Sequence, residues 1–527
     1  MIADLTTRRF GLLALVLALA VGPSNPALRA QAMRTDRSAS SASSVALSPL
    51  VGFDAYVAKA VKDWDVPGLA IAVVKDDSVV FIRGYGVKSI GGNDSVNVHT
   101  LFANASTTKA FTAFAVLLMA DSGKLSLDSR VADRLPVLQL QSAYASQELT
   151  VRDLLTHRSG LPEADYLWYD TPYDYNEIAR RLRLVKPTHS FRSHFQYQNE
   201  TYAAAGYIAA QAAGATWEEM YRARIFAPLG MQETYTSTEQ AVAHGNIATP
   251  HYRIDDTVRA IERYHTDNIG PAGSMYSSVS DMSKWLRFLL DSARSGGKRM
   301  IGAAQFNELW HAQMLVDADE FYPTARLTHP NFTAYGLGWF LEDYRGERVA
   351  FHTGSIDGFV AIVGLIPERK FGVIIFANLD HAEVRHALMY TVFDRFIGGG
   401  THDWSAEMNT MYTAARTQRA KSVAAAAKKR VMGTKPTLPL VAYAGTYQDP
   451  LYGTFTIKLA DGKLFVTDPL DPADLEHWNY DTFSLVHWKR WLGKQLVTFT
   501  FDTEGLVNGV TPGEGIVFAK MPEAVKK

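Results

Sequence analysis

The feature that most constrains the fold is a change of hydrophobic pattern along the chain. From about residue 53 to 397, segments with apolar residues at helical spacing alternate with segments rich in β-branched residues. Beyond residue 440, polar residues alternate with β-branched or aromatic ones around turns such as Asp461-Gly462. The sequence therefore predicts an α/β (α+β) domain with one sheet flanked by helices, followed by a separate module of antiparallel strands.

Shifts in composition mark the boundaries between these parts. A run of serine and alanine near the start cannot bury a core, and the stretch from Ala414 to Arg430, rich in alanine and basic residues, is typical of a surface helix. We predict five segments: an export signal (1–32), a flexible tether (33–48), the α/β domain (49–400), a helix with a linker (401–439) and the β module (440–525).

The first residues are typical of an export signal. Arg8 and Arg9 precede an apolar run from Phe10 to Val21, and Ala30-Gln31-Ala32 has the small residues of a cleavage site. The apolar run is too short for a membrane-spanning helix, which needs roughly 20 residues. We expect a mature protein without an integral membrane span, in the periplasm or secreted, and the sequence leaves the Sec and Tat routes open.

Composition excludes several classes of function. The chain has 53 Lys and Arg against 54 Asp and Glu, so it lacks the positive excess typical of nucleic-acid binding. It has no cysteine, which excludes disulfides and a thiol nucleophile, and its 15 histidines include no closely spaced pair of metal ligands. We expect no cofactor and no metal, and the sequence does not indicate an oligomeric state.

Ser106 and Lys109 form the strongest candidate for chemistry. They lie three residues apart at the start of an apolar helical segment, so their side chains share one helix face. A serine hydroxyl needs a neighbouring base to become nucleophilic, and a desolvated lysine can be that base. A second Ser-x-x-Lys, Ser295 to Lys298, contains paired glycines, which disfavour the helix that this geometry requires.

Two further motifs could complete such a site. Tyr197 and Asn199 directly precede a helical segment, where the tyrosine could carry a proton and the amide could orient a substrate carbonyl. The alternative is a packed tyrosine and a helix-capping asparagine. His352-Thr353-Gly354-Ser355 follows a strand-like run and could face the same pocket, although a simple strand-end turn has the same pattern.

The three motifs, in this order and at these distances, resemble the penicillin-recognising serine hydrolases, in the branch of class C β-lactamases, D-Ala-D-Ala peptidases and related esterases. The resemblance spans about residues 53–397. It implies a β-lactamase/transpeptidase-like fold with an antiparallel sheet, and the C-terminal module is similar to appended β-barrel, lipocalin-like domains. Other similar stretches are Gly123 to Asp128, Leu154 to Pro162, Pro271 to Ser277 and Tyr335 to Trp339.

The resemblance assigns roles to the residues of the three motifs. Ser106 would be the nucleophile, Lys109 and Tyr197 the acid/base pair, and Asn199 a substrate-orienting amide. His352, Thr353, Gly354 and Ser355 would bind substrate, and the backbone N–H groups of Ser106 and Ser355 would form the oxyanion hole.

His352 departs from the family's Lys-Thr-Gly pattern, because a largely neutral imidazole holds a substrate carboxylate more weakly than a lysine. We therefore expect an exported hydrolase of a small ester, peptide or lactam, with esterase or D-amino-acid peptidase activity favoured over dedicated β-lactamase activity. A non-catalytic binder of peptidoglycan or peptide on the same fold is the alternative. His157 could serve as a base in a Ser-His-Asp enzyme, but its neighbours match a structural segment of the family.

Overall fold

The computed structural model describes residues 48–468, 471–513 and 515–522. The predicted export signal, and the predicted tether up to residue 47, lie outside these residues. Two clusters of buried apolar side chains are present, one in the α/β part and one inside the C-terminal module. Each of the two parts therefore has a core of its own, as an independently packed domain requires.

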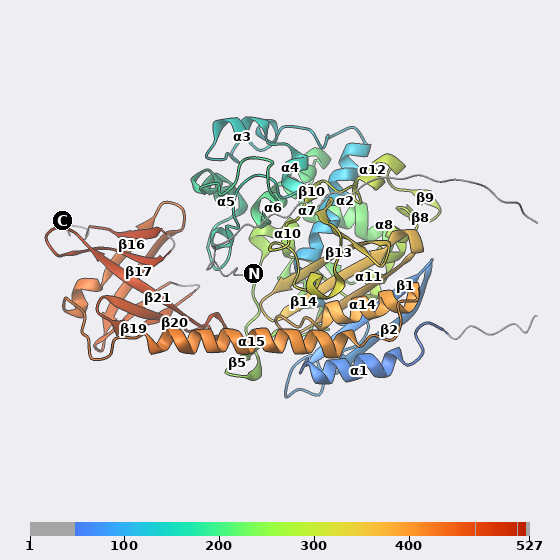
Figure 1. Cartoon of the computed structure of the whole chain (residues 1–527). Helices are drawn as coiled ribbons and strands as arrows, with labels where there is room; N and C mark the ends of the chain where they lie inside the picture. Colours follow the sequence, from blue (N-terminus) through green and yellow to red (C-terminus); the bar gives the residue numbers. More distant parts are fainter. Residues whose placement is uncertain (1–47, 469–470, 514, 523–527) are drawn as a thin grey trace, which may run out of the picture. The chain divides into compact units, whose positions relative to one another are not determined.

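An eight-stranded antiparallel sheet is the centre of the α/β part (Figure 1). Its strands, in spatial order, are β10 (Met314–Leu315), β11 (Thr333–Tyr335), β12 (Phe340–Tyr344), β13 (Glu347–Ile356), β14 (Phe359–Ile366), β15 (Phe371–Ala377), β1 (Gly68–Lys75) and β2 (Ser78–Gly86). The first strand of the chain thus lies beside β15, about 300 residues later in the sequence. The expectation of a sheet flanked by helices, antiparallel as the resemblance implied, is confirmed, and three much smaller sheets accompany it.

Helices cover both faces of this sheet. A Cβ atom added to Gly364 in β14 would meet Met389 and Phe393 of α14 (Val384–Ile397). Gly372 in β15 pairs with Leu365, the residue after Gly364. A Cβ atom added to Gly372 would instead meet Leu286 of α11 (Val279–Leu290). Because successive residues of a strand point to opposite faces, α14 and α11 lie on opposite sides of the sheet. This arrangement explains why β14 and β15 are buried along their whole length.

The remaining helices surround the sheet and carry the candidate site. The helix expected from Ala105 begins as a short 3-10 turn, η1 (Ala105–Thr107), and continues as α2 (Thr108–Asp121), most of which is buried because its residues are small or apolar on every side. The others are α1 (Phe53–Asp63), α3 (Ala143–Glu148), α4 (Val151–Leu155), α5 (Tyr175–Arg181), α6 (Asn199–Ala213), α7 (Trp217–Tyr221), α8 (Ala227–Leu229), α9 (Thr238–His244), α10 (Gly270–Gly273), α12 (Ala303–Glu308) and α13 (Ala325–Thr328).

Short strands complete the α/β part. They are β3 (Phe102–Ala103), β7 (Tyr276–Ser277) and β4 (Thr234–Tyr235) in one small sheet, and the hairpins of β5 (His251–Ile254) with β6 (Thr257–Ala260) and β8 (Arg294–Ser295) with β9 (Lys298–Arg299). The second Ser-x-x-Lys sequence therefore forms a hairpin and not a helix, as its glycines predicted. The pairing of β3 with β7 leads the chain directly into η1.

The long helix α15 (Trp404–Lys428) links the two parts of the sequence. It begins about ten residues earlier than the alanine-rich pattern predicted, because Asp403 caps it and Trp404 buries its ring against the α/β core. The C-terminal module is a closed barrel of eight strands, β16 (Gly445–Asp449), β17 (Gly453–Ala460), β18 (Lys463–Val466), β19 (Ala473–Asn479), β20 (Thr482–His487), β21 (Lys494–Phe501), β22 (Val507–Gly513) and β23 (Ile516–Lys520).

Candidate active site

Lys109 lies at the centre of the candidate site and is fully buried on the first turn of α2. Its Nζ atom is 3.1 Å from Ser106 Oγ, 2.7 Å from Asn199 Oδ1 and 3.0 Å from the backbone oxygen of Ala272. The structure therefore brings Ser106, Lys109 and Asn199 together. Three partners account for the three N–H bonds of an ammonium group, so the lysine side chain has one well-defined orientation.

Burial governs the charge of this lysine. Desolvation lowers the pKa of Lys109 to about 7, although the nearby carboxyl groups of Asp165, Glu200 and Glu163 oppose the shift. A substantial fraction of Lys109 is thus neutral at physiological pH and can accept the proton of Ser106. A solvated lysine, with its ordinary pKa near 10.4, could not do so at that pH.

Tyr197 lies beside both residues. Its ring centre is 4.8 Å from Lys109 Nζ. Burial raises the pKa of Tyr197 well above 10, and its hydrogen bond with Ser106 opposes this only in part. The phenol therefore keeps its proton at neutral pH, so it could donate a proton but is a poor acceptor, and Lys109 is the better candidate for the base.

The segment before α2 holds Ser106 in a strained turn. Ala105, which precedes the serine, has a φ of +45°, in the left-handed region that non-glycine residues seldom adopt. Strand β13 packs closely against this turn, and Gly354 makes the approach possible because a side chain there would collide with the backbone oxygen of Asn104. Ser355 follows Gly354 and is exposed at this end of β13.

A buried arginine supports the end of β13. Arg385 Nη1 donates to the backbone oxygen of Gly354 at 2.5 Å and to Ser355 Oγ at 2.9 Å. Its guanidinium group also pairs with the carboxylate of Glu383 through two hydrogen bonds, at 3.1 and 3.0 Å. Because its charge is balanced and its donors are used, Arg385 stabilises the strand and is not a free cation for a substrate.

His352 is placed in β13 but points into the protein. Its side chain is 1% exposed. Nδ1 lies 2.6 Å from the backbone oxygen of Thr353, so Nδ1 carries the proton, and Nε2 accepts from Tyr335 Oη at 2.9 Å. Burial lowers the pKa of His352 to about 3, so the ring is neutral. Thr353 is also buried, and its hydroxyl pairs with Tyr322 Oη at 2.6 Å.

His157 lies under the site without the geometry of a base. Its ring stacks on Tyr197 with centres 4.5 Å apart, and its Nδ1 accepts the backbone N–H of Gln198 at 3.0 Å. The pKa of His157 is lowered well below 6.5 by burial. The lone pair that a base needs is therefore already used, and His157 supports the loop that carries Tyr197.

Four residues that contact the site were not predicted from the three motifs: Ala272, Tyr335, Arg385 and Asp165. The oxygen of Ala272 and the hydroxyl of Tyr335 come from stretches that resembled the family without an assigned role. Arg385 and Asp165 gave no signal, because single charged residues are common in any sequence. Asp165 accepts from Asn199 Nδ2 at 2.9 Å and so contacts the site through that amide.

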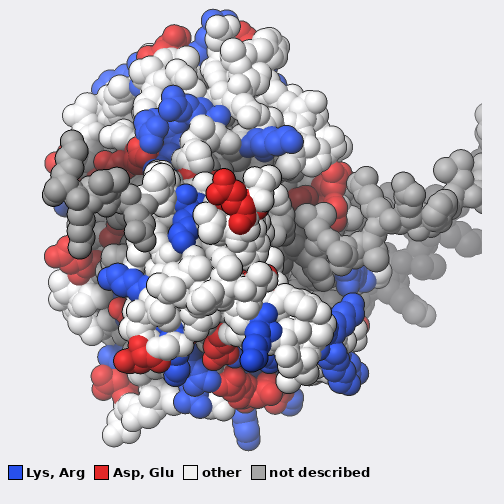
Figure 2. Space-filling model, turned by 90° about the vertical axis from the view of Figure 1, so that its left-hand side faces the viewer, with Lys and Arg blue, Asp and Glu red and all other residues white. Residues whose placement is uncertain are grey.

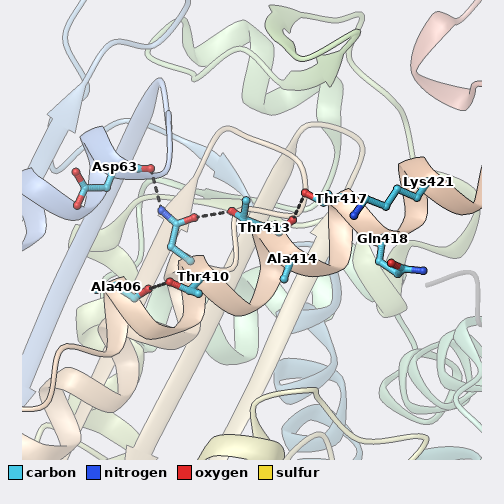
Figure 3. Close-up of a pocket in the computed structure, with 9 residues that line it drawn as sticks. Asp63, Ala406, Thr410, Thr413, Ala414, Thr417, Gln418 and Lys421 are labelled. Atoms are coloured by element: carbon cyan, nitrogen blue, oxygen red, sulfur yellow. Dashed lines mark hydrogen bonds between the residues drawn. The ribbon is translucent and has the colours of Figure 1, made fainter.

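Other surfaces offer less chemistry. A shallow hollow runs along α15 beside Asp63 (Figure 3), where polar side chains such as Asn409 and Thr413 already bond to the helix or to its neighbour. Positive and negative side chains are interspersed on the face drawn in Figure 2. Among the described residues, no group of three metal-ligating side chains occurs, and no helix is long and apolar enough to cross a membrane.

The comparisons with known proteins agree with this geometry. Residues 53–392 match the family described as Beta-lactamase, and residues 429–516 match a domain of unknown function, DUF3471. The chain therefore belongs to the Beta-lactamase family and is a serine hydrolase with a C-terminal DUF3471 domain, which forms the eight-stranded barrel. A specific likeness of this barrel to the lipocalins stays a prediction.

Two curated relatives match this chain at low sequence identity but over 60% or more of its length. The chain is 29% identical over 426 residues to "Unguisins hydrolase ungD'" of Aspergillus campestris, which covers 77% of each chain. It is 25% identical over 331 residues to "Protein flp" of Staphylococcus aureus strain COL, which covers 60% of each.

Two solved structures share the fold. An octameric penicillin-binding protein homologue from Pyrococcus abyssi has a TM-score of 0.60 at 20% identity, covering 89% of this chain and 100% of its own. A class C beta-lactamase has a TM-score of 0.54 at 19% identity, with 66% and 96% covered.

Proposed function

We propose that this protein hydrolyses an ester or amide bond through an acyl-Ser106 intermediate. The observation that carries the proposal is the environment of Lys109, a buried amine with a lowered pKa, 3.1 Å from the serine hydroxyl. An amine held in this way can remove the proton of Ser106 as its oxygen attacks a carbonyl carbon. The name of the Aspergillus campestris relative, an unguisins hydrolase, supports hydrolysis as the reaction.

The remaining steps follow from the surrounding groups. The backbone N–H groups of Ser106 and Ser355 stabilise the oxyanion that forms when the carbonyl double bond opens. The proton taken by Lys109 passes through Tyr197 to the leaving alcohol or amine, and the acyl group stays on Ser106. Water then attacks the acyl carbon and gives a proton to the same pair; the bond to Ser106 Oγ breaks, the proton returns to Oγ, and the acid product leaves.

A small neutral ester, or a D-amino-acid peptide without a free carboxylate next to the cleaved bond, fits this site better than a β-lactam. A neutral His352 with both ring nitrogens bonded to the protein supplies no positive charge for the carboxylate of a lactam. Arg385, the cation behind the same strand, is already paired with Glu383. We therefore infer esterase or peptidase activity, with lactam hydrolysis as a minor reaction.

A parallel assay tests the proposal. Wild type and Ser106→Ala are compared on a short-chain p-nitrophenyl ester, a D-Ala-D-Ala peptide and a chromogenic cephalosporin. We expect ester or peptide turnover that Ser106→Ala abolishes, together with the mass of a fluorophosphonate adduct on the Ser106 peptide. A protein that binds peptide without turnover and takes no adduct would instead be the non-catalytic binder.

We also propose that the protein is exported to the periplasm or beyond. The support is the charged start, the apolar run and the small-residue cleavage site within residues 1–32. Expression of the full gene product in a bacterium, followed by fractionation and N-terminal sequencing, tests this. A mature start near Met33 in the periplasmic or culture fraction is expected, and an uncleaved protein in the cytoplasm would refute export.

A further inference from the structure

The side chain of Asn199 has a defined direction, and its two polar atoms contact two different charged groups. Its oxygen Oδ1 accepts from Lys109 Nζ at 2.7 Å, and its nitrogen Nδ2 donates to Asp165 Oδ1 at 2.9 Å. The same Asp165 oxygen accepts from the indole of Trp168 at 2.7 Å. A chain of hydrogen bonds thus runs from Asp165 through Asn199 to Lys109, the proposed catalytic base.

The direction of this amide decides where the lone pair of Lys109 lies. A neutral lysine has two N–H bonds and one lone pair. The oxygen of Asn199 and the backbone oxygen of Ala272 can only accept hydrogen bonds, so they take the two N–H bonds. The lone pair is then left for the third neighbour, Ser106, whose hydroxyl must lose a proton.

The opposite orientation of the amide would disable the base. An Asn199 turned by half a rotation would place its NH2 group toward Lys109, and this group would donate into the lone pair. A carboxylate accepts hydrogen bonds and cannot donate them, so Asp165 favours the orientation in which Nδ2 faces it and Oδ1 faces Lys109. The indole of Trp168 holds the carboxylate at this place.

We propose that Asp165 is a positioning residue, which sets the direction of the Asn199 amide and through it directs the lone pair of Lys109 toward Ser106. This rests on the proposed function, because it concerns the activation of the same serine. It also bears on the substrate, because Asn199 Nδ2 already donates its hydrogen bond to Asp165. The site then selects substrates that need no amide donor from Asn199.

The charge of Asp165 has a second, measurable effect. Three carboxyl groups oppose the lowering of the pKa of Lys109, and Asp165 has the largest effect, followed by Glu200 and Glu163. Burial raises the pKa of Glu200 well above its usual range, which favours its neutral form. On the other sides, Lys109 faces the rings of Tyr197 and Tyr202 and the two buried, neutral histidines.

Two substitutions at this position separate the two effects. Asp165→Asn keeps an oxygen for Trp168 and Asn199 but removes the charge, so the pKa of Lys109 should fall by about one unit. The rate of Ser106 labelling by a fluorophosphonate, measured against pH, should then rise at a pH about one unit lower than in wild type. Asp165→Ala should shift the midpoint in the same direction and also reduce the plateau rate about tenfold, because the amide is free to turn.

Glu163→Gln is the matched control, because Glu163 acts on Lys109 more weakly than Asp165 does. Glu163 shares a side-chain hydrogen bond with Asp165, and a glutamine amide can still donate such a bond. The described side-chain hydrogen bonds of Asn199 run to Lys109 and Asp165 and not to Glu163. We expect a smaller shift of the midpoint and an unchanged plateau. A double-mutant cycle of Asp165→Ala with Asn199→Ala completes the test, and the loss from Asp165→Ala should largely vanish when Asn199 is absent.

The outcomes distinguish this inference from the function on which it rests. If wild type is not labelled at Ser106, the acyl-enzyme mechanism itself fails. If wild type is labelled but Asp165→Asn and Asp165→Ala keep its pH midpoint and plateau, only the positioning role is refuted. Additive losses in the double-mutant cycle, or equal shifts for Glu163→Gln and Asp165→Asn, would likewise contradict it.

Discussion

Replacement of Gly354 by alanine tests the contact that packs β13 against the turn before Ser106. A methyl group at this position would lie 2.1 Å from the backbone oxygen of Asn104, whereas ordinary contact begins at 3.4 Å. Strand β13 and the turn before Ser106 must therefore separate by about 1.3 Å. A displacement of 1 Å at reacting groups can cost about 100-fold in rate, which corresponds to roughly 2.7 kcal/mol.

We expect Gly354→Ala to lower kcat/KM for a p-nitrophenyl ester about 100-fold or more, and to lower the free energy of unfolding by about 1–3 kcal/mol through overpacking. Gly273→Ala is the matched control. Its added methyl group would approach the backbone of Ala105, the residue after Asn104, but only to 3.8 Å, which is ordinary contact. We expect this variant to stay within about twofold of wild type. Wild-type kcat/KM in folded Gly354→Ala would refute the close packing of β13 on the nucleophile turn.

Three further predictions concern charge. Because Lys109 must be neutral to accept a proton, kcat/KM should rise with pH through a midpoint near its pKa of about 7, and should be about one hundredth of its plateau at pH 5; a flat profile from pH 5 to 9 would exclude Lys109 as the base. His352→Lys replaces a buried imidazole with a longer side chain that carries a charge, so the ratio of kcat/KM for a cephalosporin to that for a neutral ester should rise about tenfold, and an unchanged ratio in a folded variant would show that a cation on residue 352 does not reach the substrate. Burial raises the pKa of Asp153, but hydrogen bonds from Arg192, Thr150 and Arg158 outweigh it and lower that pKa, so the stability this carboxylate provides is present at neutral pH and is lost as pH falls. Urea unfolding should therefore show Asp153→Asn less stable than wild type by about 3–5 kcal/mol at pH 7, with a smaller difference at pH 3, and equal stability at pH 7 would contradict the ion pairs.

The elements with a strong local pattern were predictable from the sequence. The β1–β2 hairpin has β-branched residues on both sides of Asp76-Asp77, and α6 and α11 have long apolar faces. Helix α15 was placed too late, because its first turn is held by Trp404, whose indole donates to Asp394 in α14. That contact depends on the tertiary structure and leaves no periodic pattern in the sequence.

The candidate site was predictable only where several residues form a motif. Ser106, Lys109 and Asn199 meet as expected because a helix face and a helix start place them. The direction of the His352 side chain was not predictable, since it depends on Tyr335 from the neighbouring part of the sheet. Asp165 begins a single 3-10 turn, η3 (Asp165–Leu167), which is too short to give a periodic pattern, so only the structure reveals that it contacts Asn199.

The pairing of β1 with β15 has a consequence for how the protein is made. Residues 68–75 leave the ribosome early, but their partner strand, residues 371–377, is synthesised about 300 residues later. Until then one edge of the β1–β2 hairpin has no partner, and a bare strand edge invites pairing with other chains. Contacts between segments so far apart also slow folding, because a long loop must close before they form. The unpaired edge of the nascent chain is therefore accessible to chaperones for a long interval. The central sheet is completed only after almost the whole α/β domain has been made.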